Sequence, residues 1–276
     1  MRIALAGASG IVGGFVLRAA QAAGHHVTRL DRGTGFHLGD APDLSGVDAL
    51  IHCAFAHAPG RYRGGEGDDP DRFLRLNRDG TFRLFDKAAR DGVGRIVFLS
   101  SRAVHDGHPA GMTLPDDLPA RPVNLYGQVK AEAEDHLANL PLKGTSVRAT
   151  GIYGHAAKWR DLFDDYLAGH SIQPRVATEV HGDDMAAAIL LLLSQTDPPR
   201  QVNCSDLVLD RHDLLAEVQA LTDCPHPLPQ RADPAPLRVQ RCDRLRTIGW
   251  QPGGTARLGA AMPGLLASSL SKYPRG

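Results

Sequence analysis

The sequence has little cysteine, no HExxH motif and no excess of either charge. Its four cysteines form no CxxC pair and no metal-finger spacing, which disfavours a disulfide scaffold and a zinc site. The 31 basic and 31 acidic side chains cancel, so no net field attracts nucleic acid or a membrane surface. We therefore expect a small-molecule partner, with no nucleic acid, no membrane and no metal ion.

Long hydrophobic runs are also missing. The longest run is MAAAILLLL at 185–193, nine residues, which is less than half of a membrane span. The chain opens MRIALAG, which reads as a strand, without the charged region and apolar core of a signal peptide. We expect a cytoplasmic protein. At 276 residues and 42% hydrophobic content, it can form one large domain, or one domain with a smaller lobe.

The first half of the chain alternates short β-type runs with helical patterns. Repeated βα units imply a parallel sheet covered by helices on both faces. We therefore predict an α/β fold, a Rossmann-type doubly wound parallel sheet with a small C-terminal substrate lobe. Strands are expected at 2–8, 25–32, 47–55, 94–101 and 144–154, and helices at 13–24, near 70–91 and at 126–140.

A glycine-rich turn, GASGIVG, joins the first expected strand to the first expected helix. Its glycines, Gly7, Gly10 and Gly13, are three residues apart. Such a turn offers unpaired N–H groups and a positive helix end to a pyrophosphate. Thirty glycines would produce this spacing by chance, but the strand before it and the helix after it favour a dinucleotide site. The predicted phosphate-binding residues are Gly7, Gly10, Ile11, Val12 and Gly13.

An acidic residue, Asp31, ends the second expected strand, eighteen residues beyond Gly13. A carboxylate there accepts hydrogen bonds from both ribose hydroxyls and repels a 2′-phosphate, which favours NAD over NADP. Arg32 beside it could tolerate NADP, which stays the less favoured cofactor. A structural tight turn with a surface aspartate is the other interpretation.

The pattern loosens after residue 154. Helices are expected at 159–169, 183–195 and 211–222, a strand at QVNCSD, and a proline-rich loop at 224–236. We predict that residues 1–154 form the NAD-binding Rossmann domain. Residues 155–276 are expected to complete the sheet and form the smaller substrate-binding lobe, within a single compact unit.

The stretch NLYGQVKAEAEDHL places Tyr126 and Lys130 one helical turn apart, where they share a face. A tyrosine with a pKa of about 10 is a base at neutral pH only if a nearby cation favours the phenolate. An ammonium one turn away supplies that cation. The spacing alone is only suggestive, but beside a dinucleotide fold it predicts a proton-transfer pair.

Together these motifs resemble the extended short-chain dehydrogenase/reductases, also called the NAD-dependent epimerase/dehydratase family. The likeness covers nearly the whole chain, and the motifs occur in the family's order: GxxGxxG, Asp31, GD ending at Asp40, VDALIHCAF, LNRDGTFRLFDKAAR, RIVFLSSRAV, YxxxK, VRATGIYG, VHGDDMA and LRTIGWQP.

The resemblance assigns further cofactor residues. It implies that Asp40 meets the adenine, that Ala54 lies along the cofactor and that Lys130 bonds the nicotinamide ribose. Asn77 would belong to the active-site helix, although it could equally be an ordinary polar helix residue. Relatives dimerise through the YxxxK helix and the helix before it, so a homodimer is expected.

The resemblance also supplies a catalytic serine. The family places its catalytic hydroxyl at the second residue of the SS pair, which selects Ser101 over Ser100 and completes a triad with Tyr126 and Lys130. Ser101 would hold the substrate oxygen. The alternative is a strand-end serine that caps the next turn.

The expected substrate class depends on where the sequence differs from, and where it resembles, particular groups of enzymes in this family. Nucleotide-sugar enzymes of the family carry an arginine before VHxxD, where this chain has Ala177, so a nucleotide sugar is less favoured. The closer likeness is to uronate dehydrogenases, whose post-strand arginine corresponds to Arg160. Arg102 could line the same pocket. Solvent-facing positions for Arg102 and Arg160 stay open, and Arg102 and Ala103 replace the Asn-His pair of those relatives.

The leading hypothesis is an NAD-dependent oxidoreductase acting on a hydroxyl or carbonyl carbon of a small sugar, sugar acid or related polar substrate. An NAD-dependent sugar or nucleotide-sugar epimerase is the first alternative. A non-catalytic dinucleotide sensor on the same fold is the second.

Overall fold

The computed structural model describes residues 1–57 and 65–270. Its largest element is a six-stranded sheet in the order β2-β1-β3-β4-β6-β9, in which all neighbouring strands are parallel. The prediction of an α/β doubly wound parallel sheet is confirmed. The strands are β1 (Arg2–Ala6), β2 (His26–Leu30), β3 (Ala49–His52), β4 (Arg95–Ser101), β6 (Lys143–Ala149) and β9 (Gln201–Cys204).

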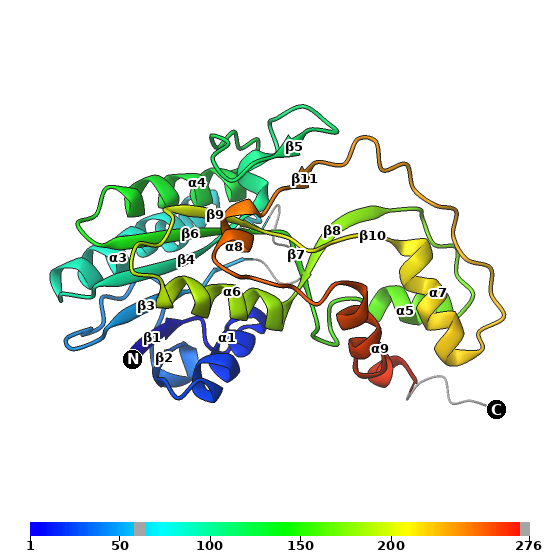
Figure 1. The fold of residues 1–276 in the computed structure, drawn as a ribbon, viewed down its shortest axis with the longest axis horizontal. Coiled ribbons are helices and arrows are strands. Elements are labelled where there is room, and N and C mark those ends of the chain that lie inside the picture. The colour runs from blue at the N-terminus through cyan, green and yellow to red at the C-terminus, as the bar shows by residue number, and fades with distance from the viewer. Residues whose placement is uncertain (58–64, 271–276) are drawn as a thin grey trace.

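Helices cover both faces of this sheet (Figure 1). One face packs on α1 and α6 and the other on α3 and α4, because alternate residues of each strand point to opposite faces. In β1, for example, Ile3 and Leu5 face the first pair of helices, and Ala4 and Ala6 face the second. These helices are α1 (Ile11–Ala22), α3 (Gly80–Arg90), α4 (Leu125–Ala138) and α6 (Gly182–Ser194).

A second, three-stranded sheet begins where the first one ends. The single strand expected at 144–154 is wrong, because β6 stops at Ala149 and β7 starts at Gly151 in the other sheet. Thr150 donates its N–H to the carbonyl of Cys204, at the last position of the large sheet. The chain then leaves that sheet. The second sheet has the order β10-β8-β7 and contains β7 (Gly151–Tyr153), β8 (Val176–His181) and β10 (Leu207–Asp210).

Beyond this sheet lies the smaller lobe, at the end of the molecule opposite β2 (Figure 1). Its core is built from large apolar side chains, among them Tyr153, Phe163, Tyr166, Leu215 and Met262. The lobe contains α5 (Arg160–Leu167), α7 (Arg211–Thr222) and α9 (Gly254–Leu270). Within the described residues, no helix combines the length and apolar character that crossing a membrane requires.

The remaining elements are short. The segment expected as one helix near 70–91 is divided into α2, a π-helical turn and α3. These elements are α2 (Pro70–Leu74), the π turn (Arg75–Asp79), α8 (Asp243–Thr247), the parallel pair β5 (Thr113–Leu114) and β11 (Val239–Gln240), and the 3-10 turns Arg32–Thr34 and Arg102–His105.

Candidate active site

The glycine turn between β1 and α1 is packed too closely for side chains. Gly7 has φ +85°, and a Cβ on it would lie 2.6 Å from the backbone nitrogen of Ala54. A Cβ on Gly13 would lie 2.0 Å from the carbonyl oxygen of Gly7. Gly10 is the N-cap of α1 and offers no side chain to that helix end. The backbone N–H groups of Ile11, Val12 and Gly13 in the first turn of α1 are therefore left for a ligand, and this cradle fits a pyrophosphate.

Asp31 lies at the carboxyl end of β2 with 4% of its surface exposed. Its Oδ1 accepts from the N–H of Gly33 at 2.9 Å, and its Oδ2 accepts from Nε and Nη2 of Arg29 at 3.1 and 2.9 Å. Arg32 is exposed in the 3-10 turn that Asp31 caps. Sequence reasoning missed Arg29, although residues two apart in a strand share a face and made this pair predictable.

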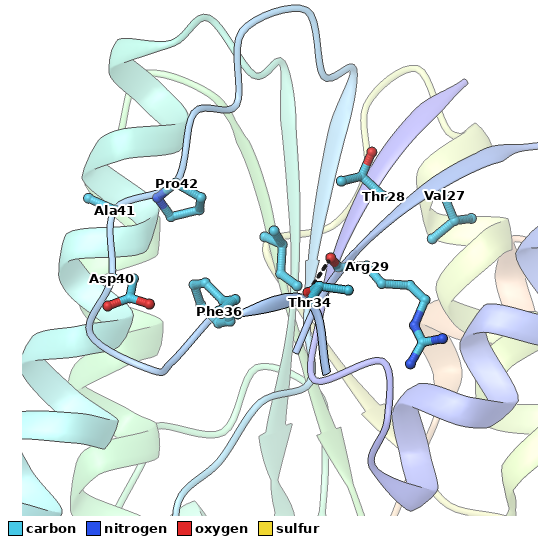
Figure 2. Close-up of a pocket in the computed structure, with 10 residues that line it drawn as sticks. Val27, Thr28, Arg29, Thr34, Phe36, Asp40, Ala41 and Pro42 are labelled. Carbon is cyan, nitrogen blue, oxygen red and sulfur yellow. Dashed lines mark hydrogen bonds between the residues drawn. The ribbon is translucent and has the colours of Figure 1, made fainter. Parts of the chain in front are cut away.

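A pocket of about 700 Å³ opens at the outer edge of β2. Figure 2 shows it between β2 and the segment that carries Phe36, Asp40 and Pro42. Asp40 is exposed, and its Oδ2 accepts from the N–H of His37 at 2.7 Å. This pocket is three strands away from β4 in the sheet. Among the cofactor residues predicted from the sequence, Asp40 lies in its lining. Its lining is Val27, Thr28, Arg29, Leu30, Thr34, Gly35, Phe36, Asp40, Ala41 and Pro42.

Asn77 holds the segment that follows β3. It is 2% exposed in the π turn, and its Oδ1 accepts from the N–H of Ala56 at 2.7 Å. Its Nδ2 donates to the carbonyl oxygens of Ala56 at 2.8 Å and Phe73 at 3.1 Å. The amide therefore fixes the backbone just beyond Ala54. Ala54 itself lies against Gly7, so Asn77 secures one wall of the glycine turn.

The two serines at the end of β4 have different environments. Ser100 is buried, and its hydroxyl donates to Oε1 of Glu134 at 2.5 Å. Ser101 is half-buried at the strand end, where its Oγ accepts from the N–H of Ala103 at 3.2 Å. Ser100 is thus committed to α4, whereas the Ser101 hydroxyl retains its own proton to donate.

Tyr126 and Lys130 lie on the inner face of α4, which begins after Asn124. The Oδ1 of Asn124 accepts from the N–H of Gly127 at 2.8 Å and caps the helix. Lys130 is 5% exposed, and its Nζ donates to the carbonyl oxygen of Leu99 at 2.7 Å. Burial lowers the pKa of Lys130 to about 7. Since Leu99 is in β4, this bond brings the lysine to the strand that ends at Ser101.

The two arginines predicted for the substrate lie in different settings. Arg102 is 18% exposed, and its Nη1 lies 3.1 Å from Oδ1 of Asp106. Arg160 is exposed at the first position of α5. In the loop before Arg160, Lys158 pairs instead with the buried Glu179 of β8, at 3.1 Å.

Sequence reasoning missed Lys158 and Glu179. Burial raises the pKa of the Glu179 carboxyl, with Lys158 opposing that shift. Glu179 is aligned with Gly151 in the β7–β8 pairing, and a Cβ on Gly151 would lie 2.2 Å from its Oε2. A glycine directly opposite an acid on the neighbouring strand indicates that the acid side chain lies over it. This pairing can be recognised only when the strand register is known.

The parallel sheet, the closely packed glycine turn and the buried acid at the end of β2 define a dinucleotide-binding protein of the Rossmann type. The model of the NAD dependent epimerase/dehydratase family matches residues 3–205, and the chain belongs to this family. The family predicted from the sequence motifs, with NAD as its cofactor, is confirmed.

Individual relatives agree with this family. The chain is 26% identical to UDP-glucose 4-epimerase of Corynebacterium glutamicum over 187 residues, which are 59% of this chain and 55% of the epimerase. It is 31% identical to uronate dehydrogenase of Pseudomonas syringae pv. tomato over 93 residues, 33% of this chain and 30% of that enzyme. The matched stretch therefore spans about half of the length of the epimerase.

The fold also matches solved structures. A short-chain dehydrogenase/reductase superfamily protein from Agrobacterium tumefaciens with bound NAD superposes with a TM-score of 0.76 at 21% identity. The superposition covers 98% of this chain and 100% of that one. The chain thus shares its fold with this short-chain dehydrogenase/reductase superfamily protein.

Proposed function

We propose that the protein is an NAD-dependent oxidoreductase that transfers a hydride between nicotinamide and a hydroxyl or carbonyl carbon of a small sugar, sugar acid or related polar substrate. The observation that carries this proposal is the arrangement around β4. Ser101 ends that strand, and Lys130 reaches the carbonyl of Leu99 from α4, one turn after Tyr126. A hydroxyl, a phenol and an ammonium are therefore supplied from two adjoining elements.

Each proposed catalytic residue has a distinct task. Ser101 donates a hydrogen bond to the substrate oxygen, and the Tyr126 phenolate takes the hydroxyl proton at Oη when the substrate is oxidised. The Lys130 ammonium favours that phenolate by charge. NAD, when bound, accepts the hydride. In the reverse direction the Tyr126 phenol returns the proton to the substrate oxygen.

The proposed cofactor residues divide by the part of NAD they meet. The turn from Gly7 to Gly13 takes the pyrophosphate, because its N–H groups can be approached closely. Asp31 takes the adenosine ribose, with Arg29 orienting its carboxylate. Asp40 is proposed for the adenine and Lys130 for the nicotinamide ribose. Asn77 contributes by holding the backbone of Ala56.

The substrate is proposed to meet Ser101, Tyr126, Arg102 and Arg160. The partial likeness to uronate dehydrogenase supports a carboxylate-bearing sugar, and an arginine fork suits that group. A second candidate function is sugar epimerisation, which the likeness to UDP-glucose 4-epimerase favours. In that reaction the same residues serve, NAD stays bound, and no NADH accumulates. A sensor function would need none of the three catalytic side chains.

The test is reduced-nicotinamide absorbance on mixing the protein with NAD and, separately, uronic acids, neutral aldoses and UDP-sugars. We expect NADH with a free sugar or sugar acid, and a fall in rate of about 10²- to 10⁴-fold in Tyr126→Phe. Tyr166→Phe is the matched control, since that hydroxyl bonds the carbonyl of His226 in the smaller lobe. Conversion of a UDP-sugar without NADH would favour the epimerase. Undiminished activity in Tyr126→Phe would rule out the catalytic proposal.

We also propose a homodimer that forms through α3 and α4. The two helices are joined by Phe82 and His136, whose stacked ring centroids lie 4.2 Å apart, and His136 Nε2 lies 2.7 Å from Oδ1 of Asp86. Sedimentation equilibrium should give twice the mass of the chain. Gln128→Arg with Asp135→Arg, both exposed on α4, should shift the mass toward the monomer by like-charge repulsion.

The matched control for this experiment places the same charges elsewhere. Glu217→Arg with Ala220→Arg alters two exposed positions of α7 and should leave the dimer intact. A wild-type mass of one chain at micromolar concentration would contradict the proposal.

A further inference from the structure

Phe55 contacts both members of the proposed Tyr–Lys pair. Its ring centroid lies 5.1 Å from that of Tyr126, with the ring planes at 83°. The Nζ of Lys130 lies 4.6 Å from the centroid of Phe55 and 4.7 Å from that of Phe98. Since Nζ also donates to the carbonyl of Leu99, the ammonium is enclosed by two aromatic faces and one carbonyl oxygen.

The backbone that carries Phe55 is held on both sides. Ala54, before it, packs against Gly7, and Ala56, after it, is bonded in both directions by the Asn77 amide. The ring of Phe73 meets the Phe55 ring edge to face at 5.5 Å. Phe55 is therefore placed by the same contacts that shape the cofactor turn.

We propose that Phe55 is a positioning residue of the catalytic pair: its ring holds the Tyr126 ring and the Lys130 ammonium in the relative placement that proton transfer needs. This inference rests on the proposed function, because it assigns Phe55 to the same Tyr126 and Lys130. The chemistry is that of an aromatic ring, whose negative face attracts a cation and whose neighbours pack edge to face.

The charge state of Lys130 depends on its titratable neighbours as well as on the two aromatic rings. Burial raises the pKa of Cys53 to about 12 and lowers the pKa of His52 to about 3. Burial also lowers the pKa of Lys130, whereas Cys53 and Glu134, one turn along α4, raise it. Tyr126 is the group on which the lysine acts.

Removal of the Phe55 ring withdraws attraction from the charged lysine, so the pKa of Lys130 falls further. Less ammonium then faces the phenolate, so the pKa of Tyr126 rises. The acid limb of the pH profile for hydroxyl oxidation moves to higher pH.

The experiment compares Phe55→Leu with Phe55→Tyr, which retains the ring. In the ligand-free protein, the titration of lysine Cε carbons is followed by NMR, and Lys130→Met identifies the resonance of Lys130. We expect the Lys130 midpoint to fall by about half a pH unit or more in Phe55→Leu, and to return in Phe55→Tyr. The acid limb of kcat should move upward and be restored in the same two variants.

The inference and the proposed function fail in different ways. If Tyr126→Phe leaves turnover unchanged, the proposed function is wrong, and the inference falls with it. If Tyr126→Phe abolishes turnover while Phe55→Leu leaves both the lysine titration and the acid limb unchanged, the inference alone is overturned. Should Phe55→Leu not fold, Phe55→Met fills the space without a ring and is read by the same two measurements.

Discussion

At the scale of single residues, a buried ion pair lies behind the proposed catalytic side chains. Arg148 of β6 is 2% exposed, and its Nη2 donates to Oε2 of Glu134 at 2.6 Å. Its Nη1 donates to the carbonyl of Leu118 at 2.8 Å. Because Glu134 also receives the hydroxyl of Ser100, this pair ties α4 to two strands of the sheet.

Loss of one partner from this pair should be costly. Arg148→Met leaves the Glu134 carboxylate buried without its cation, and we expect the free energy of unfolding to fall by about 3–5 kcal/mol. Urea unfolding measures this change. The control is the double variant Arg148→Met with Glu134→Leu, whose loss should be smaller than the sum of the two single losses. A loss below about 1 kcal/mol in Arg148→Met would contradict the prediction.

Residue types were easier to predict than residue partners. Of the proposed catalytic residues, Tyr126 and Lys130 come from a motif and Ser101 from the family resemblance. The structure adds a reason for separating the serines, since Ser100 is committed to Glu134. The capping turn that the sequence left open for Ser101 is also present. The contacts of Phe55 with Tyr126 and Lys130 join segments more than seventy residues apart, so no local pattern could have indicated them.

At the scale of elements, boundaries depended on tertiary contacts. The helix expected at 126–140 spans Leu125–Ala138, and the side chain of Asn124 caps its start. The helix expected at 13–24 begins earlier, at Ile11. Gly13 is therefore inside the helix, where a glycine is required by close packing against Gly7 and not by a turn. The segment expected as one strand at 144–154 changes sheets at Thr150, and a strand pattern in the sequence cannot show such a change.

The π turn at Arg75–Asp79 shows the same limit. It interrupts a segment whose periodicity predicts one continuous helix. The turn carries the buried amide of Asn77, which bonds the backbone of Ala56. A helical bulge that carries a proposed cofactor residue is recognised from its partners, and these lie in another part of the chain.

At the scale of the whole molecule, the sheet depends on a buried histidine staying neutral. His52 ends β3 beneath the helical layer, 1% exposed, with its Nε2 3.0 Å from the hydroxyl of Thr81. Its ring packs on those of Phe85 and Phe98. Burial, assisted by the charge of Lys130, lowers the pKa of His52 to about 3.

Acid should therefore destabilise the fold through His52. Between its ordinary pKa near 6.5 and the folded value of about 3, the unfolded chain binds more protons, so stability is complete above pH 6.5 and is lost as the pH falls. From pH 7 to pH 5, urea unfolding should lose up to about 2 kcal/mol from this group. His52→Gln, which keeps a polar atom near Thr81, should remove that part of the slope. His26→Gln, on the exposed side of β2, should retain it, and equal slopes in the two variants would mean that His52 does not carry the acid sensitivity.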